Sequence, residues 1–95
     1  MRTSELTLLI PCYNEAENIP VVLPEMIEFA RAHNFKIVLV NDGSSDNSKI
    51  ELAKFDDRSL LTIVHHKLNR GYGAALKSGL KQCETEYTIT LDADG

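Results

Sequence analysis

The sequence has no long hydrophobic run. Its longest apolar stretches, residues 8–10 and 37–40, have the length of buried strands and fall far short of the roughly 20 residues that a membrane-spanning helix needs. Residues 1–5 carry neither the apolar segment nor the small-residue cleavage site of an export signal. We therefore expect no membrane span and a cytoplasmic location.

Cysteine is scarce, and Cys12 and Cys83 stand far apart in the sequence. Neither belongs to a C-x-x-C pair or to a Cys/His cluster, and the sequence contains no N-x-Ser/Thr glycosylation acceptor. These absences disfavour a disulfide framework and a structural zinc site. We expect two free thiols in a reducing compartment.

Positive charge is in the minority. Ten Lys and Arg residues stand against fourteen Asp and Glu residues, which gives a net charge of −4. This sign disfavours binding to nucleic-acid phosphates. A length of 95 residues, with 43% hydrophobic and 25% charged residues, suits one globular domain with a single core.

Short stretches rich in Leu, Ile, Val and Thr have the size and composition of strands. They are residues 6–10, 36–40, 60–65 and 87–91. Between them lie three helical patterns. Residues 19–30 carry apolar side chains at the spacing of one buried helix face. A capping-box sequence from Ser48 to Glu51 predicts a helix that ends near Phe55. A third helix over residues 72–83 is predicted by a stripe made of Tyr72, Leu76, Gly79, Leu80 and Cys83.

The order β-α-β-α-β-α-β predicts an α/β fold with a Rossmann-like open parallel sheet and helices on both faces. Ligands bind at the carboxyl ends of the strands in such sheets. The polar and glycine-rich segments of this sequence follow the expected strands at residues 11–15, 41–46, 66–73 and 92–95. We therefore expect the functional residues to gather along this edge.

Asp92 and Asp94 follow the fourth expected strand. Together they can offer oxygen ligands to one hard cation such as Mg²⁺ or Mn²⁺. Two carboxylates leave coordination positions open for waters and ligand phosphates, as expected where a metal joins a protein to a diphosphate. A lone D-x-D triplet is a weak signal, and the alternative is the polar start of a loop.

Asp42 follows the second expected strand and precedes Gly43. Its carboxylate can accept hydrogen bonds from a nucleobase edge, and glycine lets a ligand approach the backbone. The alternative is ordinary turn chemistry. Tyr13 could stack on a base and Glu15 could bond a ribose or a base edge, although either residue could simply close its loop.

Lys67 and Arg70 supply positive charge before a predicted helix N-terminus, which itself favours anions. A diphosphate suits this environment, and solvated surface charge is the alternative. The segment is neither a dinucleotide fingerprint nor a P-loop. His65 and His66 are adjacent on a strand and point to opposite faces, so we expect structural roles, with one packed and the other exposed.

Four segments in this order, residues 9–19, 40–46, 69–75 and 91–95, together resemble glycosyltransferase family 2. The likeness is greatest to the dolichyl- or polyprenyl-phosphate mannosyl and glucosyl transferases, and it covers essentially the whole chain. The resemblance implies the N-terminal half of a GT-A fold with strand order 3-2-1-4. It also implies the residues that bind the nucleotide-sugar, which are Pro11, Tyr13, Asn14, Glu15, Asp42, Gly43, Lys67, Asn69, Arg70, Gly71 and Asp92.

The implied metal is Mg²⁺ or Mn²⁺, held by Asp92 and Asp94. The implied activity is inverting transfer of a sugar from a UDP- or GDP-sugar to an acceptor, with polyprenyl phosphate as one acceptor class, at the cytoplasmic face of a membrane in the full-length protein. We expect residues 1–95 to be the nucleotide-sugar-binding portion of a longer domain, ending after the D-x-D motif. We assign no catalytic base to them and expect binding without turnover.

Two alternatives to this function remain at the level of sequence. One is a haloacid-dehalogenase-like phosphatase with Asp92 as the nucleophile, since residues 91–95 also resemble its motif. The other is a nucleotide-binding module without enzymatic activity. In the implied strand order the fourth strand, residues 87–91, is an edge, and an open edge predicts self-association.

Overall fold

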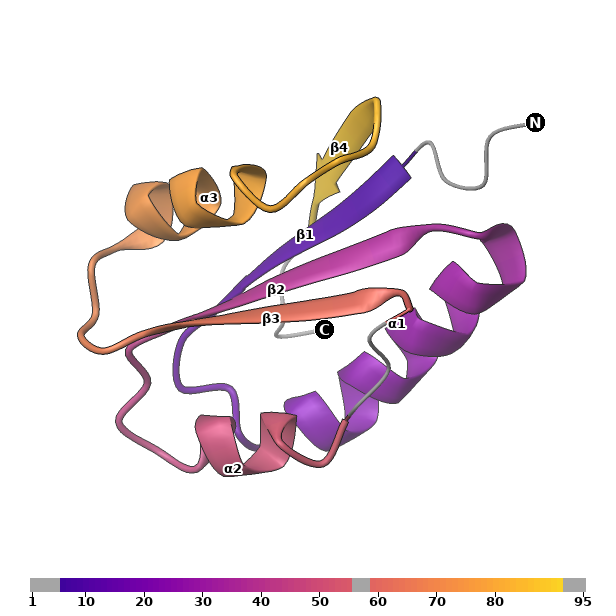
Figure 1. Cartoon of the computed structure of the whole chain (residues 1–95). Coiled ribbons are helices and arrows are strands. Elements are labelled where there is room, and N and C mark those ends of the chain that lie inside the picture. The colour runs from indigo at the N-terminus through magenta and orange to yellow at the C-terminus, as the bar shows by residue number, and fades with distance from the viewer. Residues whose placement is uncertain (1–5, 56–58, 92–95) are drawn as a thin grey trace.

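The computed structural model describes residues 6–55 and 59–91 of the chain. Strands and helices alternate along them as predicted (Figure 1). In chain order the elements are β1 (Leu6–Cys12), α1 (Ile19–His33), β2 (Lys36–Asp42), α2 (Ser48–Leu52), β3 (Leu61–His66), α3 (Tyr72–Leu80) and β4 (Tyr87–Thr90).

The four strands form one parallel sheet in the order β3-β2-β1-β4. This confirms the implied strand order. β1 lies at the centre, where Ile10 is opposite Leu39 of β2 and Leu8 is opposite Ile89 of β4. The order reverses between β1 and β4, which is the point where ligands bind in open α/β sheets.

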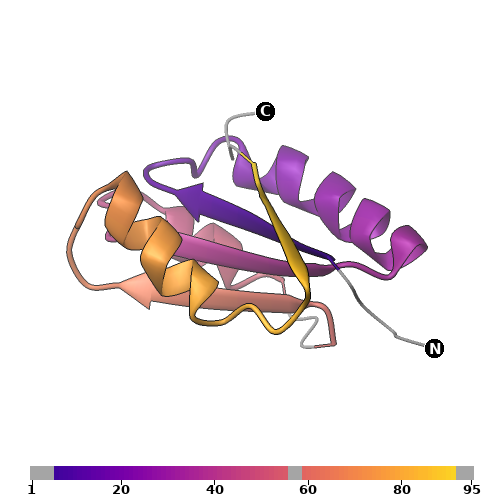
Figure 2. The same ribbon diagram turned by 90° about the horizontal axis from the view of Figure 1, so that it is seen from above.

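Helices cover both faces of the sheet (Figures 1 and 2). α1 and α2 lie on one face, where the larger core cluster includes Ile19, Leu23, Ile27 and Ala30 of α1. α3 lies on the other face, where Ala75 packs with the smaller cluster of sheet residues Leu9, Val38 and Val40. Because β1 and β2 are buried on both faces, their sequences are nearly continuous hydrophobic runs.

The capping box predicted at Ser48 is wrong. Ser48 lies inside α2, and it donates its N–H and its hydroxyl to Oδ1 of Asp46 at 2.9 and 2.6 Å. The carboxylate of Asp46, two residues before Ser48, therefore accepts a backbone N–H group at the start of the helix that has no partner within the helix. α2 ends at Leu52, three residues before Phe55.

The apolar stripe predicted for the third helix is also partly wrong. Tyr72 and Leu80 are exposed, with 59% and 53% of their surfaces accessible. The buried face of α3 carries Gly79, which belonged to the predicted stripe, and Ala75, which did not. A Cβ on Gly79 would lie 2.2 Å from Cδ1 of Leu9, so the helix sits very close to the sheet.

Both cysteines are free thiols, as expected, with Cys12 buried and Cys83 partly buried. In the residues that the structure describes, no helix has the length and apolar character needed to cross a membrane.

Candidate functional site

A cavity of about 230 Å³ opens at the carboxyl ends of β1 and β2. Its walls come from both strands, from the loop after β3 and from the start of α3. The lining residues are Pro11, Cys12, Tyr13, Asp42, Asn69, Gly71, Tyr72 and Ala75. The sequence predicted a site at this edge of the sheet, and five of these residues were among those expected to bind the ligand.

Two exposed aromatic rings, Tyr13 and Tyr72, belong to this cavity. Tyr72 was not predicted as a site residue because it was counted in the apolar stripe of the third helix. Its position between Gly71 and Gly73, at the start of a helix that follows a strand, could have identified it. Aromatic rings at a cavity mouth offer flat surfaces for stacking.

Cys12 also lines the cavity but is not suited to act as a nucleophile. Burial, followed by the nearby negative charge of Glu15, raises the pKa of its thiol to about 11. The thiol is therefore neutral at neutral pH, and the thiolate is the reactive form.

Asp42 is the most heavily bonded side chain of the site. Its Oδ1 accepts hydrogen bonds from His66 Nδ1 at 2.7 Å and from the N–H of Arg70 at 3.0 Å. Its Oδ2 accepts the N–H of Gly71 at 2.9 Å and Nδ2 of Asn69 at 3.3 Å. A carboxylate has about four acceptor positions, so these four donors occupy its capacity.

These hydrogen bonds also control the ionisation of Asp42. Burial alone would raise the pKa of this carboxyl, because it disfavours the charged form. The hydrogen bonds from His66, Arg70 and Gly71 outweigh that effect and hold the pKa below its ordinary value of 3.8. Asp42 is therefore an ionised anchor for the loop after β3.

Gly43 lies where the loop after β2 meets the loop after β3. Its φ is +66°, and a Cβ here would lie 2.1 Å from the carbonyl carbon of Leu68 and 2.2 Å from the nitrogen of Asn69. Glycine is required both for this backbone conformation and for the close approach. Asp42 and Gly43 thus hold the two loops against each other.

The loop after β1 is joined to the loop after β2. Oδ1 of Asn14 accepts the N–H groups of Ser45 and Asp46 at 2.8 and 3.3 Å. The N–H of Asn14 donates to Oγ of Ser44 at 2.9 Å, and the N–H of Glu15 donates to Oγ of Ser48 at 3.0 Å. Asn14 and Glu15 therefore support the loop that presents Tyr13 to the cavity.

Sequence reasoning missed Ser44, Asp46 and Ser48 as parts of this junction. The available signal was the cluster of short polar side chains after β2, which commonly bond to nearby backbone. That signal predicts a structured turn, but it does not say which distant backbone groups the side chains will meet.

Lys67 and Arg70 are exposed on the loop between β3 and α3. Within residues 6–55 and 59–91 neither side chain forms an ion pair with a carboxylate. Their charges are thus available to an anionic ligand at this edge of the sheet.

The expected metal ligands, Asp92 and Asp94, lie outside the described residues. In the described part of the chain, no group of three or more His, Cys, Asp or Glu side chains could hold a metal ion. Leu91, the last described residue, donates its N–H to the carbonyl of Leu9 at 2.9 Å. The described chain therefore ends beside β1, on the side where the strand order reverses.

A second cavity, of about 270 Å³, lies at the other end of the strands, where they begin. Its lining includes Thr7 of β1, Lys36 of β2 and Thr85 before β4. It is larger than the first cavity, but it lies at the amino ends of the strands, away from the loops that carry the predicted residues. We therefore assign the candidate site to the smaller cavity.

Two curated relatives illustrate the similarity of this chain to known proteins. An undecaprenyl-phosphate 4-deoxy-4-formamido-L-arabinose transferase from Pseudomonas savastanoi is 41% identical over 93 residues, covering 94% of this chain and 28% of the relative. A poly-beta-1,6-N-acetyl-D-glucosamine synthase from Staphylococcus aureus is 36% identical over 89 residues, covering 94% of this chain and 21% of the relative. The chain thus spans about a quarter of the length of these relatives.

Solved structures show the same fold. The mannosyltransferase PcManGT from Pyrobaculum calidifontis, in complex with GDP-Man and Mn²⁺, matches with a TM-score of 0.82 and 28% identity over 95% of this chain and 27% of its own. Staphylococcus aureus TarS in complex with UDP-GlcNAc matches with a TM-score of 0.80 and 26% identity, and the match covers 95% of this chain and 26% of TarS.

A family model agrees with these similarities and extends over nearly all of the sequence. It is the model described as glycosyl transferase family 2, and it matches residues 7–95. The strand order, the site at the carboxyl ends of the strands and the relatives' names all agree with it, and none supports the phosphatase alternative. The chain belongs to glycosyl transferase family 2.

Proposed function

We propose that these residues form the nucleotide-sugar-binding part of a glycosyltransferase that uses a UDP- or GDP-sugar. The observation that carries this proposal is the cavity at the carboxyl ends of β1 and β2, with Tyr13 and Tyr72 in its lining. Solved structures with the same fold contain GDP-Man in one case and UDP-GlcNAc in the other.

In this proposal the base and ribose occupy the cavity beside Pro11 and Tyr13. Glu15 donates its backbone N–H to Ser48, and its Oε1 accepts Nδ2 of Asn18 at 2.7 Å. Its other carboxylate oxygen can accept a ribose hydroxyl. Asn14 contributes indirectly, by holding the loop.

A contact between Asp42 and the base edge has a specific requirement. All four acceptor positions of Asp42 are in use, so a base donor must replace one partner. The contact with Asn69 Nδ2, at 3.3 Å, is longer than the other three. We therefore propose that the base edge displaces Asn69, while His66 and the two backbone N–H groups stay bonded.

The diphosphate fits the start of α3. Among the described residues, no side chain caps this helix, whose N-cap is Gly71. The first N–H groups of a helix have no intrahelical partner and attract anions. Lys67 and Arg70, on the preceding loop, add positive charge, and exposed Gly73 leaves room for close approach.

Asp92 and Asp94 are the proposed metal ligands. Carboxylate oxygens suit hard cations such as Mg²⁺ and Mn²⁺, and Mn²⁺ is present in the PcManGT complex. When bound, such an ion neutralises the negative charge of the departing nucleoside diphosphate. The chain's own cationic residues, Lys67 and Arg70, act on the same charge.

The proposed reaction is direct displacement at the anomeric carbon by an acceptor oxygen. A polyprenyl phosphate is one acceptor class, as the name of the undecaprenyl-phosphate transferase suggests. An acceptor of this class would place the full-length protein at the cytoplasmic face of a membrane.

A phosphate acceptor is already ionised, so its attack needs little base catalysis. Because these residues span about a quarter of their relatives, we propose that they bind the donor without turning it over.

Calorimetry with UDP and GDP tests this function. We expect tighter nucleotide binding with Mn²⁺ or Mg²⁺ than with EDTA, and we expect Asp92→Asn/Asp94→Asn to abolish that difference. The matched control is Glu25→Gln/Glu28→Gln, which makes the same change of charge on the exposed face of α1. The metal assignment fails if the double aspartate variant keeps the metal enhancement. The nucleotide assignment fails if neither nucleotide binds the unmodified chain.

A further inference from the structure

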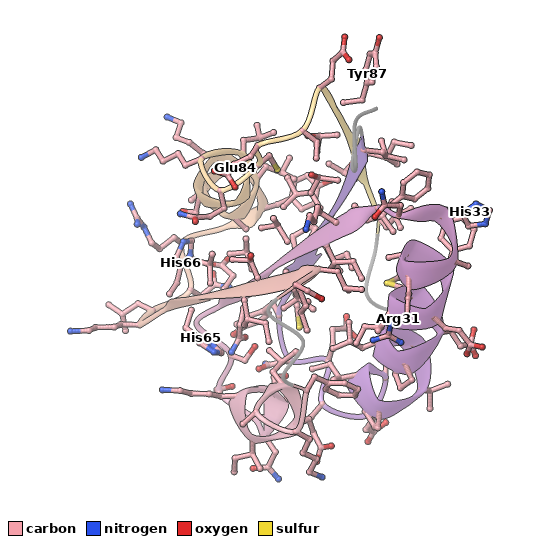
Figure 3. All side chains as sticks on the ribbon, turned by 45° about the vertical axis from the view of Figure 1, so that its right-hand side comes forward. Arg31, His33, His65, His66, Glu84 and Tyr87 are labelled. Atoms are coloured by element: carbon pink, nitrogen blue, oxygen red, sulfur yellow. The ribbon has the colours of Figure 1, made fainter. Side chains whose placement is uncertain are left out.

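His66 joins two residues that are far apart in sequence. Its Nδ1 lies 2.7 Å from Oδ1 of Asp42, and its Nε2 lies 2.7 Å from Oγ of Ser78 in α3. The side chain is nearly buried, with 7% of its surface exposed. Figure 3 shows His66 on the side of β3 that faces α3, whereas His65 points to the opposite side, toward α2.

A carboxylate, an imidazole and a hydroxyl in this order also occur in serine hydrolases. Ser78, however, lies inside α3, where backbone N–H groups bond to carbonyls of the same helix. A hydrolase needs free N–H groups near the nucleophile to stabilise an oxyanion. The interior of a regular helix does not offer them, so a nucleophilic role for Ser78 does not fit.

The contacts instead form a chain that leads to the proposed diphosphate site. Ser78 contacts His66, and His66 contacts Oδ1 of Asp42. Asp42 in turn accepts the N–H groups of Arg70 and Gly71. Gly71 is the N-cap of α3. The network thus fixes the end of the loop that carries Lys67 and Arg70.

We propose that His66 and Ser78 are positioning residues, which orient Asp42 and thereby hold the loop 67–71 and the start of α3 in the conformation that receives the diphosphate. This inference rests on the proposed nucleotide-sugar function. Neither residue is expected to touch the ligand. Their effect is to increase the fraction of molecules whose loop is ready to bind.

The geometry also assigns the proton on His66. An ionised Asp42 only accepts hydrogen bonds, so Nδ1 of His66 must carry a proton. In a neutral ring, Nε2 then accepts the hydroxyl of Ser78. ¹⁵N chemical shifts of the His66 ring in the unmodified chain test this without a substitution. We expect a protonated Nδ1, and an unprotonated Nδ1 would overturn the network.

Two substitutions of His66 separate its two contacts. The amide of His66→Asn can still reach Asp42 from the place of Nδ1 but is too short for Ser78, whereas His66→Gln reaches toward Ser78 and loses Asp42. Ser78→Ala removes the hydroxyl alone. His65→Asn is the matched control, because it makes the same change at the neighbouring residue, which bonds to Asn41 instead.

Amide hydrogen exchange at Arg70 and Gly71, measured without nucleotide, reads the order of the loop. We expect His66→Gln to speed this exchange on the order of tenfold and to weaken UDP or GDP binding by a similar factor. The two factors agree because apparent affinity is proportional to the fraction of molecules whose loop is in the binding conformation. His66→Asn and Ser78→Ala should have smaller effects. Exchange in β1 and β2 should not change, which distinguishes loop release from global unfolding.

The positioning role is wrong if His66→Gln folds and leaves exchange at Arg70 and Gly71 as slow as in the unmodified chain or in His65→Asn. If His66→Gln does not fold, Ser78→Ala and His66→Asn decide by the same measurement. Faster loop exchange in a chain that binds neither nucleotide would keep the role of His66 in ordering the loop and overturn the nucleotide function.

Discussion

At the scale of single residues, Asp42 has both a structural and a proposed binding role. Its carboxylate joins β2 to β3 through His66 and to the start of α3 through the N–H groups of Arg70 and Gly71. Buried charges are stable only when they are paired and hydrogen-bonded. Asp42 meets this condition, and so the candidate site depends on a residue that also stabilises the fold.

Asp42→Asn should therefore destabilise the chain. The amide keeps one acceptor oxygen and places an NH₂ group against at least one of the N–H donors, which is left buried without an acceptor. We expect the free energy of unfolding at neutral pH to fall by about 2 kcal/mol, the typical cost of such a loss. Urea unfolding measures the change, with Glu28→Gln on the exposed face of α1 as a control that should remain near zero.

The stabilities of the unmodified chain and of Asp42→Asn should respond differently to acid. Because the pKa of Asp42 is lower in the folded chain than its ordinary value of 3.8, its contribution is fully present above pH 3.8 and is lost as the pH falls through the folded-state value. The stability difference between the unmodified chain and Asp42→Asn should narrow over that range. A difference that stays constant between neutral pH and about pH 3 would contradict the ionised anchor.

The sequence predicted where the site residues lie but not what they bond to. Asp42, Asn69 and Gly71 could be placed at one edge of the sheet because they follow predicted parallel strands. The partnership of Asp42 with His66 and Ser78 depends on how α3 packs on the sheet, at separations of 24 and 36 residues. No local pattern encodes such a contact, so the sequence could give His65 and His66 only structural roles, with one packed and the other exposed, and could not say which.

At the scale of elements, the packing of α3 depends on one small residue. Gly79 faces Leu9, which is completely buried, and a Cβ on Gly79 would lie 2.2 Å from Cδ1 of Leu9 and 3.1 Å from Cγ2 of Val40. Because Leu9 is packed in the core, it has little room to move. Glycine is thus kept in the helix for close approach, at a cost in helix propensity.

Gly79→Ala should destabilise the chain, whereas Gly73→Ala should not. Alanine in a helix gains about 1 kcal/mol over glycine, whereas overpacking a core costs about 1–3 kcal/mol. Gly73 has no atom within 4 Å of its added Cβ, so only the gain applies there. We expect thermal unfolding to show a lower Tm for Gly79→Ala and an unchanged or higher Tm for Gly73→Ala. Equal stability of the two variants would contradict the close packing of α3.

Element types were predicted well and element ends less well. The periodicity of residues 19–30 predicted α1 because its buried face is regular, and the helix continues to His33. β1 and β2 continue to Cys12 and Asp42, two residues beyond the predicted ends. These last residues include Pro11, Asn41 and Asp42, so composition does not identify the segments as strand. Pairing with the neighbouring strands makes them so.

At the scale of the whole molecule, the sheet has one edge that is poorly protected. β4 pairs with β1 on one side, and it is the outermost of the described strands. Tyr87 and Ile89 are 61% and 47% exposed. Neither Lys nor Pro, the residues that commonly protect an edge, occurs in Tyr87–Thr90. The edge expected from the sequence is therefore present among the described strands.

This edge predicts self-association of the 95-residue chain, and the flanking charges predict its dependence on salt. Carboxylates lie on both sides of β4 in the sequence, at Glu84, Glu86, Asp92 and Asp94. Two copies that pair through β4 bring these like charges together. Since salt screens charges beyond about 8–10 Å, we expect light scattering to show a mass that rises with protein concentration and rises further with salt.

A substitution at the edge strand tests the same pairing. Ile89→Lys should keep the chain monomeric, whereas Ile50→Lys, the same change at an exposed residue of α2, should not. A monomeric mass for the unmodified chain at every concentration and salt level would rule out pairing through β4.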